Sequence, residues 1–247
     1  MKTKSINWLF IIICVVALFV GCAPKAETDL LECDAATMTQ FPYNENGVIV
    51  AKHQKITPVA EHPGMVKIET YYVNKGKPIT VRAYEMCRTE VEATDSVVWS
   101  LQPSSTSGRL DWVLPVTEGF KKENYLGMNN TDYGGGIPVV DLWQKDGGVA
   151  IGLIEPVLRM ISMPVEWKRY ENKVSMSLRY EFEWPVELNT GDTLHTFTAF
   201  RYEHKGDFFN ALRAFSEVMQ KDAGIELPAS EPEAFEPVWC AWGYERT

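Results

Sequence analysis

The side chains in this sequence that are best suited to chemistry gather in its last ten residues, 238–247, a run rich in apolar and aromatic residues. The segment contains Trp239, Trp242 and Tyr244, followed at once by Glu245. Aromatic rings present broad apolar faces, and a carboxylate accepts hydrogen bonds from hydroxyl groups. Aromatic residues most often build the core of a β-rich protein, and they also suit the binding of sugars.

A second candidate lies in a glycine-rich stretch, where Asp132 and Tyr133 directly precede Gly134, Gly135 and Gly136. Glycines allow a loop to take positive φ angles or to approach another backbone closely. A phosphate-binding loop would lead into a helix, and no helical pattern follows these glycines. The sequence therefore indicates a loop that reaches another segment rather than a phosphate site.

The remaining titratable residues form no pattern of metal ligands and no acid–base pair. His195 alternates within a strand-like segment, so we expect a structural role for it. Asp111 and Asp141 each precede an apolar residue, and nothing in the sequence couples them to acid–base chemistry. The sequence predicts neither a metal site nor a cofactor, since its four histidines are scattered without ligand spacing: His53, His62, His195 and His204.

The amino-terminal segment predicts export and a lipid anchor. Lys2 and Lys4 precede the apolar run Trp8 to Val20, which is shorter than the roughly 20 apolar residues that a spanning helix needs. The ending Gly21-Cys22 resembles the lipobox of bacterial lipoproteins, which implies cleavage after residue 21 and lipidation of Cys22. An ordinary signal peptide or an uncleaved anchor are the alternatives. No aspartate follows Cys22, so we expect anchoring in the cell envelope at the outer membrane, with the periplasmic or surface face left open.

Charge and cysteine content narrow the function classes further. The whole chain has a formal charge of −9, and removal of the two lysines in residues 1–21 makes it −11. Because DNA and RNA are polyanions, this balance argues against a nucleic-acid partner. Without Cys14 and the lipidated Cys22, three cysteines remain, so at least one thiol is unpaired and the pairing of the others stays open: Cys33, Cys87 and Cys240.

The region 47–205 predicts an all-β fold, because apolar and polar residues alternate along most of it. Residues 66–73 and 79–86 both alternate and are separated by a short polar turn, which predicts a β-hairpin. Further strands are expected at 47–51, 97–101, 149–154, 174–182 and 194–200. Several such strands with glycine, asparagine and aspartate turns between them predict an antiparallel sandwich.

A single amphipathic helix is expected after the sandwich. Asp207 suits the N-cap position, and the apolar residues Phe208, Leu212, Phe215 and Met219 recur at steps of three and four. The helix should end near Gly224. Residues 227–237 contain three prolines and three glutamates, which is the composition of a linker.

The segment 236–246, Glu-Pro-Val-Trp-Cys-Ala-Trp-Gly-Tyr-Glu-Arg, resembles the first barrel strand of melibiase-type glycoside hydrolases, the α-galactosidases of family 36 and their relatives. Residues 125–143 resemble the glycine-rich turn and following strand of the β-supersandwich in the same enzymes. Together, the residue patterns and this resemblance predict five parts: a signal at 1–21, a tether and first strand at 22–46, a β-supersandwich at 47–205, a helix and linker at 206–237, and the start of a truncated (β/α)8 barrel at 238–247.

The resemblance also implies roles for individual residues. Trp242, Tyr244 and Glu245 would line the sugar pocket, and Asp132 and Tyr133 would reach the mouth of the barrel from the sandwich. The two catalytic aspartates of the family lie on later barrel strands, so none of residues 1–247 is expected to be catalytic, and the chain alone is expected to be inactive. The implied partners are carbohydrate and, through the anchor, the membrane; the sugar, its linkage and the oligomeric state stay open.

Two alternatives compete with this interpretation. The chain could be a non-catalytic surface lipoprotein that binds glycans through its sandwich, or a structural lipoprotein with no role in sugar binding. The segment 238–247 could also fold back on the sandwich as an edge strand, which would remove the connection with a barrel.

Overall fold

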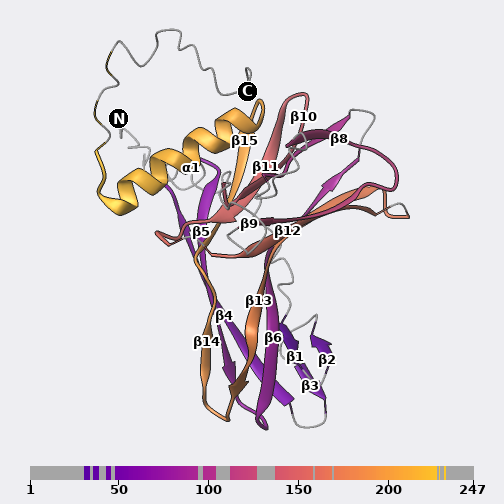
Figure 1. Ribbon diagram of the computed structural model, residues 1–247, viewed down its shortest axis with the longest axis vertical. Coiled ribbons are helices and arrows are strands. Elements are labelled where there is room, and N and C mark those ends of the chain that lie inside the picture. Colours follow the sequence, from indigo (N-terminus) through magenta and orange to yellow (C-terminus); the bar gives the residue numbers. More distant parts are fainter. Residues whose placement is uncertain are drawn as a thin grey trace, which may run out of the picture.

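The computed structural model describes residues 31–33, 36–38, 43–45, 48–93, 97–103, 112–126, 137–157, 159–168, 170–226, 228 and 231. This part of the chain forms strands and one helix (Figure 1). The strands are β1 (Leu31–Cys33), β2 (Ala36–Met38), β3 (Tyr43–Glu45), β4 (Val48–Pro58), β5 (Met65–Asn74), β6 (Ile79–Glu92), β7 (Val98–Leu101), β8 (Val113–Val116), β9 (Lys121–Leu126), β10 (Val139–Gln144), β11 (Gly147–Leu153), β12 (Ile161–Lys168), β13 (Lys173–Leu188), β14 (Thr193–His195) and β15 (Ala199–Lys205), and the helix is α1 (Phe208–Ala223).

The strands form two antiparallel sheets. The six-stranded sheet has the order β2-β1-β6-β13-β12-β9, and the nine-stranded sheet has the order β3-β4-β5-β15-β11-β10-β7-β8, with β14 paired to β5. Figure 1 shows a wide upper body, over which α1 lies, and a narrow lower part where β4, β5 and β14 run beside β6 and β13. We call this lower part the stalk.

The main core lies between the two sheets. Alternation along each strand sends one set of side chains inward, so Leu142 and Ile151 of the nine-stranded sheet pack into the same buried cluster as Met163, Val174 and Leu178 of the six-stranded sheet. All five side chains are fully buried. The predicted all-β sandwich of antiparallel strands is therefore confirmed.

The predicted hairpin between residues 66–73 and 79–86 is wrong, because the two strands belong to different sheets. β5 pairs with β4, β15 and β14, whereas β6 pairs with β1 and β13. Asn74 fixes this crossing: its amide nitrogen donates to the carbonyls of Lys77 and Leu188 at 2.9 and 2.8 Å, and its oxygen accepts from the Gly76 N–H at 3.0 Å. Alternation in two strands is equally compatible with a hairpin and with a connection between sheets.

The single strand predicted at 194–200 is divided into β14 and β15. Both pieces pair with β5, but His195 is opposite Tyr71 and Ala199 is opposite Ile68, so the break holds one extra residue. The N–H and the hydroxyl of Thr196 both donate to the carbonyl of Thr70 at this break. The exposed His195 ring packs against Tyr71, with 5.4 Å between ring centroids, which agrees with the predicted structural role.

The helix forms as predicted and builds a second, smaller core on the outer face of the nine-stranded sheet. Asp207 is the N-cap and accepts from the N–H of Phe209, and Gly224 ends the helix at φ 61°. The predicted apolar face contacts the sheet, because Leu212, Phe215 and Met219 pack with Phe200. The fourth predicted residue, Phe208, contacts Trp143 at a centroid distance of 5.2 Å.

Substitution of Asp207 by alanine is expected to lower the free energy of unfolding by about 1 kcal/mol, since it removes the side-chain acceptor from the first turn of the helix. Denaturant unfolding monitored by far-ultraviolet circular dichroism measures this loss. Asp207→Asn keeps a capping oxygen and should recover most of it; equal losses in the two variants would contradict a capping role.

Candidate functional site

The sugar-contact residues predicted from the resemblance lie outside the described residues. This holds for Trp242, Tyr244 and Glu245 in the carboxy-terminal segment and for Asp132 and Tyr133 in the connection between β9 and β10. Cys22, the predicted lipidation site, also lies outside them. Their roles remain predictions.

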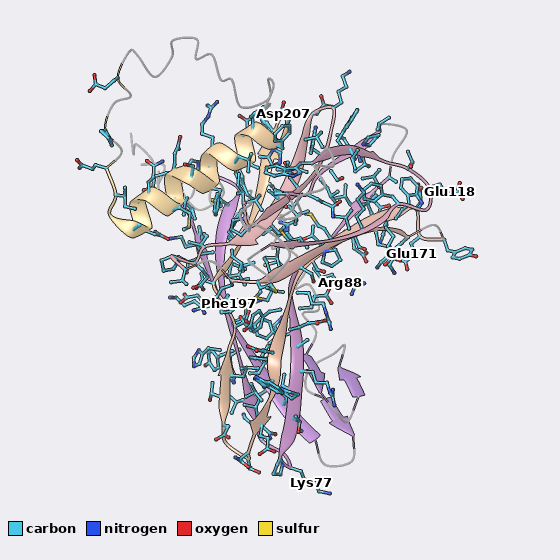
Figure 2. The ribbon with its side chains drawn as sticks, viewed as in Figure 1. Lys77, Arg88, Glu118, Glu171, Phe197 and Asp207 are labelled. Atoms are coloured by element: carbon cyan, nitrogen blue, oxygen red, sulfur yellow. The ribbon has the colours of Figure 1, made fainter. Side chains whose placement is uncertain are left out.

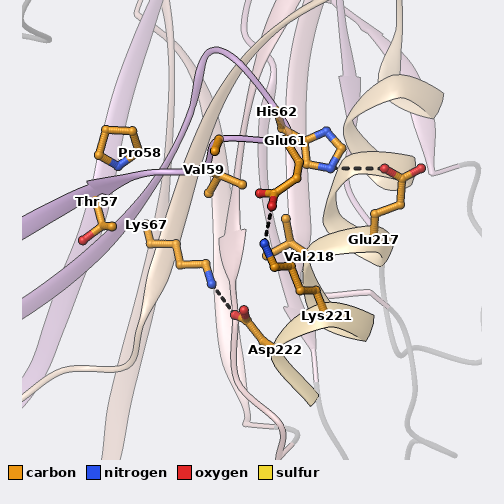
Figure 3. Close-up of a pocket in the computed structure, with 11 residues that line it drawn as sticks. Thr57, Pro58, Val59, Glu61, His62, Lys67, Glu217, Val218, Lys221 and Asp222 are labelled. Carbon is orange, nitrogen blue, oxygen red and sulfur yellow. Dashed lines mark hydrogen bonds and ion pairs between the residues drawn. The ribbon is translucent and has the colours of Figure 1, made fainter. Parts of the chain in front are cut away.

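A pocket of about 330 Å³ lies between α1 and the β4–β5 connection (Figure 3). Val59 and Val218 supply apolar walls, and charged side chains from both elements surround them. Two ion pairs join this part of the sheet to the last turn of α1, Lys67 of β5 with Asp222 and Glu61 of the β4–β5 connection with Lys221. In the same connection, His62 Nε2 lies 3.2 Å from a carboxylate oxygen of Glu217. The pocket is therefore enclosed by contacts that hold the helix to the sheet.

The carboxylates that line this pocket do not suit the role of general acid in glycoside hydrolysis. The hydrogen bond from Lys221 holds the pKa of Glu61 below its usual range, with further lowering from its own backbone. A general acid for glycoside cleavage needs a raised pKa so that it carries a proton at neutral pH. The other carboxylates here, Glu217 and Asp222, are each engaged by a basic side chain.

A buried carboxylate–imidazole pair lies under the start of α1. His204 Nε2 is 2.9 Å from Asp141 Oδ1, and neither side chain is exposed to solvent. Strand register brings the two together, because Ala150 is opposite both Asp141 and Tyr202, while Gly148 is opposite His204. Both residues thus project from the outer face of the nine-stranded sheet toward the helix.

The hydrogen bonds of His204 define the protonation of this pair. Its Nδ1 faces the carbonyl of Lys205 at 3.3 Å, which can only accept, so Nδ1 carries a proton and Nε2 shares a second proton with Asp141. Burial alone would lower the pKa of His204, but the hydrogen bond and charge of Asp141 outweigh it and raise that pKa. Burial raises the pKa of Asp141 as well.

The pairing of Asp141 with His204 was not predicted from the sequence. No spacing signal could have revealed it, since the contact joins residues 63 positions apart through the register of three strands. Because both side chains are fully enclosed, the pair has no access to a substrate and serves to position β10, β15 and the start of α1. Among the described residues, no group of three or more histidine, cysteine or acidic side chains could hold a metal ion.

The described surface carries several exposed aromatic side chains, which bear on sugar binding. Trp184 is 78% exposed and Tyr170 is 99% exposed, while Trp99, Trp112 and Tyr71 are partly exposed. A row of rings crosses the stalk, where Tyr71 stacks on His53 at 4.7 Å and touches His195 on its other side. Tyr71 thus contacts a histidine ring from each of its two neighbouring strands, β4 and β14.

The chain is similar in sequence to a glycosidase. It is 23% identical over 216 residues to the A type blood α-D-galactosamine galactosaminidase of Flavonifractor plautii, a match that covers 76% of this chain and 19% of the relative. The chain thus spans about a fifth of the length of this curated relative. No family model matches the chain.

A solved structure shares its fold. A double variant of the GH36 α-galactosidase AgaA from Geobacillus stearothermophilus, in complex with raffinose, superposes with a TM-score of 0.50 at 13% identity, covering 75% of this chain and 31% of that one. The galactosidase domain of the α-galactosidase–sucrose kinase AgaSK gives a TM-score of 0.48 at 16% identity, covering 64% and 22%. The predicted resemblance to melibiase-type enzymes is confirmed at the level of fold.

Proposed function

We propose that this chain is the β-sandwich region of an exported, lipid-anchored glycoside hydrolase that acts on α-linked galactosyl carbohydrate. The observation that carries the proposal is the similarity over 216 residues to a galactosaminidase. The β-sandwich fold shared with a GH36 α-galactosidase supports it independently of sequence identity. In this proposal the sandwich packs beside a catalytic barrel and contributes loops to its sugar pocket.

In this proposal, the catalytic carboxyl groups belong to the barrel and lie outside the 247 residues of this chain. Retaining glycosidases place two carboxyl groups about 5–5.5 Å apart, one of them a proton donor. Glu61, which lines the pocket beside α1, has a lowered pKa. A proton donor needs a raised pKa, so Glu61 does not suit that role. Trp242, Tyr244 and Glu245, with Asp132 and Tyr133, are the proposed sugar contacts, and their assignment rests on the motif resemblance.

The proposed location is the cell envelope, with lipid on Cys22. The support for this location is the order of features in residues 2–22, where two lysines are followed by an apolar run and then by Gly21-Cys22. Within the described part of the chain, no helix combines the length and hydropathy needed to cross a bilayer. Acylation of Cys22 with two or three chains would hold the protein stably at a membrane, which a single chain does not.

One observation favours the alternative of a non-catalytic glycan-binding lipoprotein. The outer face of the six-stranded sheet carries a small polar hollow, lined by Glu85, Arg88 and Ser177 among others. A site of this kind would bind a glycan without any barrel. The two functions differ in turnover, since a binding module releases its sugar unchanged.

Turnover measurements separate these proposals. The purified 247-residue chain is expected to show no hydrolysis of aryl α-galactosides or aryl N-acetyl-α-galactosaminides, because it contributes no catalytic carboxylate pair. The polypeptide produced by the complete gene is expected to hydrolyse at least one of them and to leave the β-anomers intact. Hydrolysis by the 247 residues alone would contradict this placement of the catalytic carboxyl groups, and inactivity of the complete gene product on every α-glycoside would contradict the enzymatic function.

A further inference from the structure

A hollow of about 110 Å³ opens on the outer face of the six-stranded sheet, on the side away from the main core. Its lining includes Glu85 and Arg88 of β6, Glu166 of β12, and Ser175 and Ser177 of β13. We call it the bulge hollow, because an irregularity in β6 creates it. In Figure 2, Arg88 is labelled beneath the strands of the body, beside the stalk.

The irregularity is a β-bulge centred on Cys87. Between Met86 and Thr89 the chain of β6 advances three residues, while its partner β13 advances two, from Leu178 to Met176. Cys87 takes a φ of 52°, which is a left-handed conformation that a residue with a side chain adopts at a cost. Strain of this kind in the middle of a long strand persists when the surrounding structure enforces it, and it often marks a functional position.

The bulge changes which side chains share a face. In a regular strand, residues 85 and 88 would point to opposite sides of the sheet, since side chains alternate. The extra residue at the bulge turns Arg88 to the same side as Glu85, and its Nη1 lies 3.5 Å from Glu85 Oε2. The strained turn therefore places a guanidinium beside a carboxylate on the outer face.

The floor between these two groups is made of small hydroxyl side chains. Ser175 is 8% exposed and Ser177 is 3% exposed, although neither faces the main core. The Ser175 hydroxyl donates to the carbonyl of Glu166 at 3.4 Å, and Glu85 itself is only 9% exposed. The long side chains around the serines form walls, and the short serines leave the space between them open.

The charges of the bulge hollow select the class of ligand. The carboxylates of Glu85 and Glu166 would repel an anion. Each also has a basic partner, Arg88 at 3.5 Å and Lys121 at 3.3 Å, which balances its charge and would repel a cation. A neutral molecule with adjacent hydroxyl groups meets neither penalty, because one hydroxyl can donate to Glu85 while a neighbouring oxygen accepts from Arg88. The serine hydroxyls both donate and accept, so they complete such a set.

We propose that the bulge hollow binds one edge of a neutral sugar ring, as a glycan contact separate from the pocket predicted around Trp242. The hollow has space for about three or four waters at roughly 30 Å³ each, so two or three ring hydroxyls enter it and the remainder of the sugar lies outside. This inference rests on the proposed function, since it takes carbohydrate as the natural partner of the chain.

The test is a titration of the full chain with D-galactose, N-acetyl-D-galactosamine and D-glucose, followed by two-dimensional amide NMR. At least one sugar is expected to shift amide signals of residues 85–88 and 175–177 in a saturable way. Glu85→Gln and Arg88→Gln are each expected to weaken binding about tenfold, because each removes a charged hydrogen-bonding partner. Glu187→Gln, the same change at an exposed position of β13, should bind as the unchanged protein does.

A second variant separates binding from folding. Ser177→Val fills the floor without removing a charge, and it is expected to abolish the shifts while the melting temperature is retained. The proposal is overturned if no sugar shifts the signals of residues 85–88 and 175–177 in the unchanged protein, or if Glu85→Gln and Ser177→Val bind as tightly as Glu187→Gln. Either result would leave the proposed glycosidase standing, because that function is judged by turnover in the complete gene product.

Discussion

Replacement of His204 by alanine is expected to lower the free energy of unfolding by about 3–5 kcal/mol. The substitution leaves the carboxylate of Asp141 fully buried, and its second oxygen, Oδ2, already lacks a hydrogen-bond partner among the described residues. An isolated buried charge is costly, because it loses its hydration without gaining a partner. Urea unfolding of the variant and of the unchanged chain measures the loss, when the unfolding free energies of both are fitted with the same dependence on urea concentration.

An exposed ion pair provides the matched control. Lys55 and Glu69 are 2.7 Å apart on the surface of the stalk, and Glu69→Gln should cost less than about 1 kcal/mol because solvent screens such pairs. If His204→Ala costs no more than Glu69→Gln, the carboxylate is not left unpaired and the assignment of the buried pair is wrong. Double replacement of Asp141 and His204 by apolar residues should recover part of the loss.

The pair also predicts the pH dependence of stability. The pKa of His204 is raised in the folded protein, so its contribution is complete below the unfolded value near 6.5 and is lost as pH rises through the folded value. Above pH 6.5 the unfolded histidine has released its proton while the folded pair retains one. Stability should therefore fall as pH rises from about 6.5, and this fall should be absent when both Asp141 and His204 are replaced by apolar residues.

Replacement of Phe200 by alanine is expected to cost about 3–5 kcal/mol and to loosen α1 from the sheet. The ring of Phe200 is fully buried, and its centroid lies 5.7 Å from that of Phe215 on the helix. It also covers Gly152, where an added Cβ would lie 2.6 Å from the ring. The large loss follows because truncation opens a cavity between two elements whose backbones cannot close it.

Hydrogen exchange and urea unfolding together test this prediction. Amides of residues 212–219 should exchange faster in Phe200→Ala, and the midpoint of unfolding should fall. Phe209→Ala is the control, since that ring is 63% exposed and its loss should change stability by well under the cost of a buried ring. Unchanged helix protection in Phe200→Ala would show that the ring does not join helix and sheet.

Local patterns in the sequence predicted most elements of the fold but not their partners. The helix was predicted from its N-cap Asp207, its C-cap Gly224 and the spacing of its apolar residues. These signals suffice because a helix is specified by residues within one or two turns of each other. The strands at 66–73 and 79–86 followed from alternation in the same way. Their assignment to one hairpin failed, because the buried amide of Asn74 sends the chain from one sheet to the other.

The strands β8, β9 and β12 were not predicted. Pro115 lies within β8 and Pro164 within β12, and the segment Lys121–Leu126 alternates weakly, so these strands depend on their neighbours more than on their own composition. β8 and β9 are edge strands, where one side of the backbone needs no partner strand. Strands whose own residues have weak β-propensity and weak alternation form because neighbouring strands pair with them, and local patterns do not reveal such pairing.

The sequence by itself determined the class of the fold, the helix with both of its caps, and the resemblance to melibiase-type enzymes, because each depends on residues that are close together along the chain. Only the tertiary structure decided which groups meet. The contact of Asp141 with His204 depends on the register of β10, β11 and β15, and that of Glu85 with Arg88 depends on a single bulge. A shift of one residue in register moves every side chain to the opposite face, so contacts of this kind exist only once the sheets have formed.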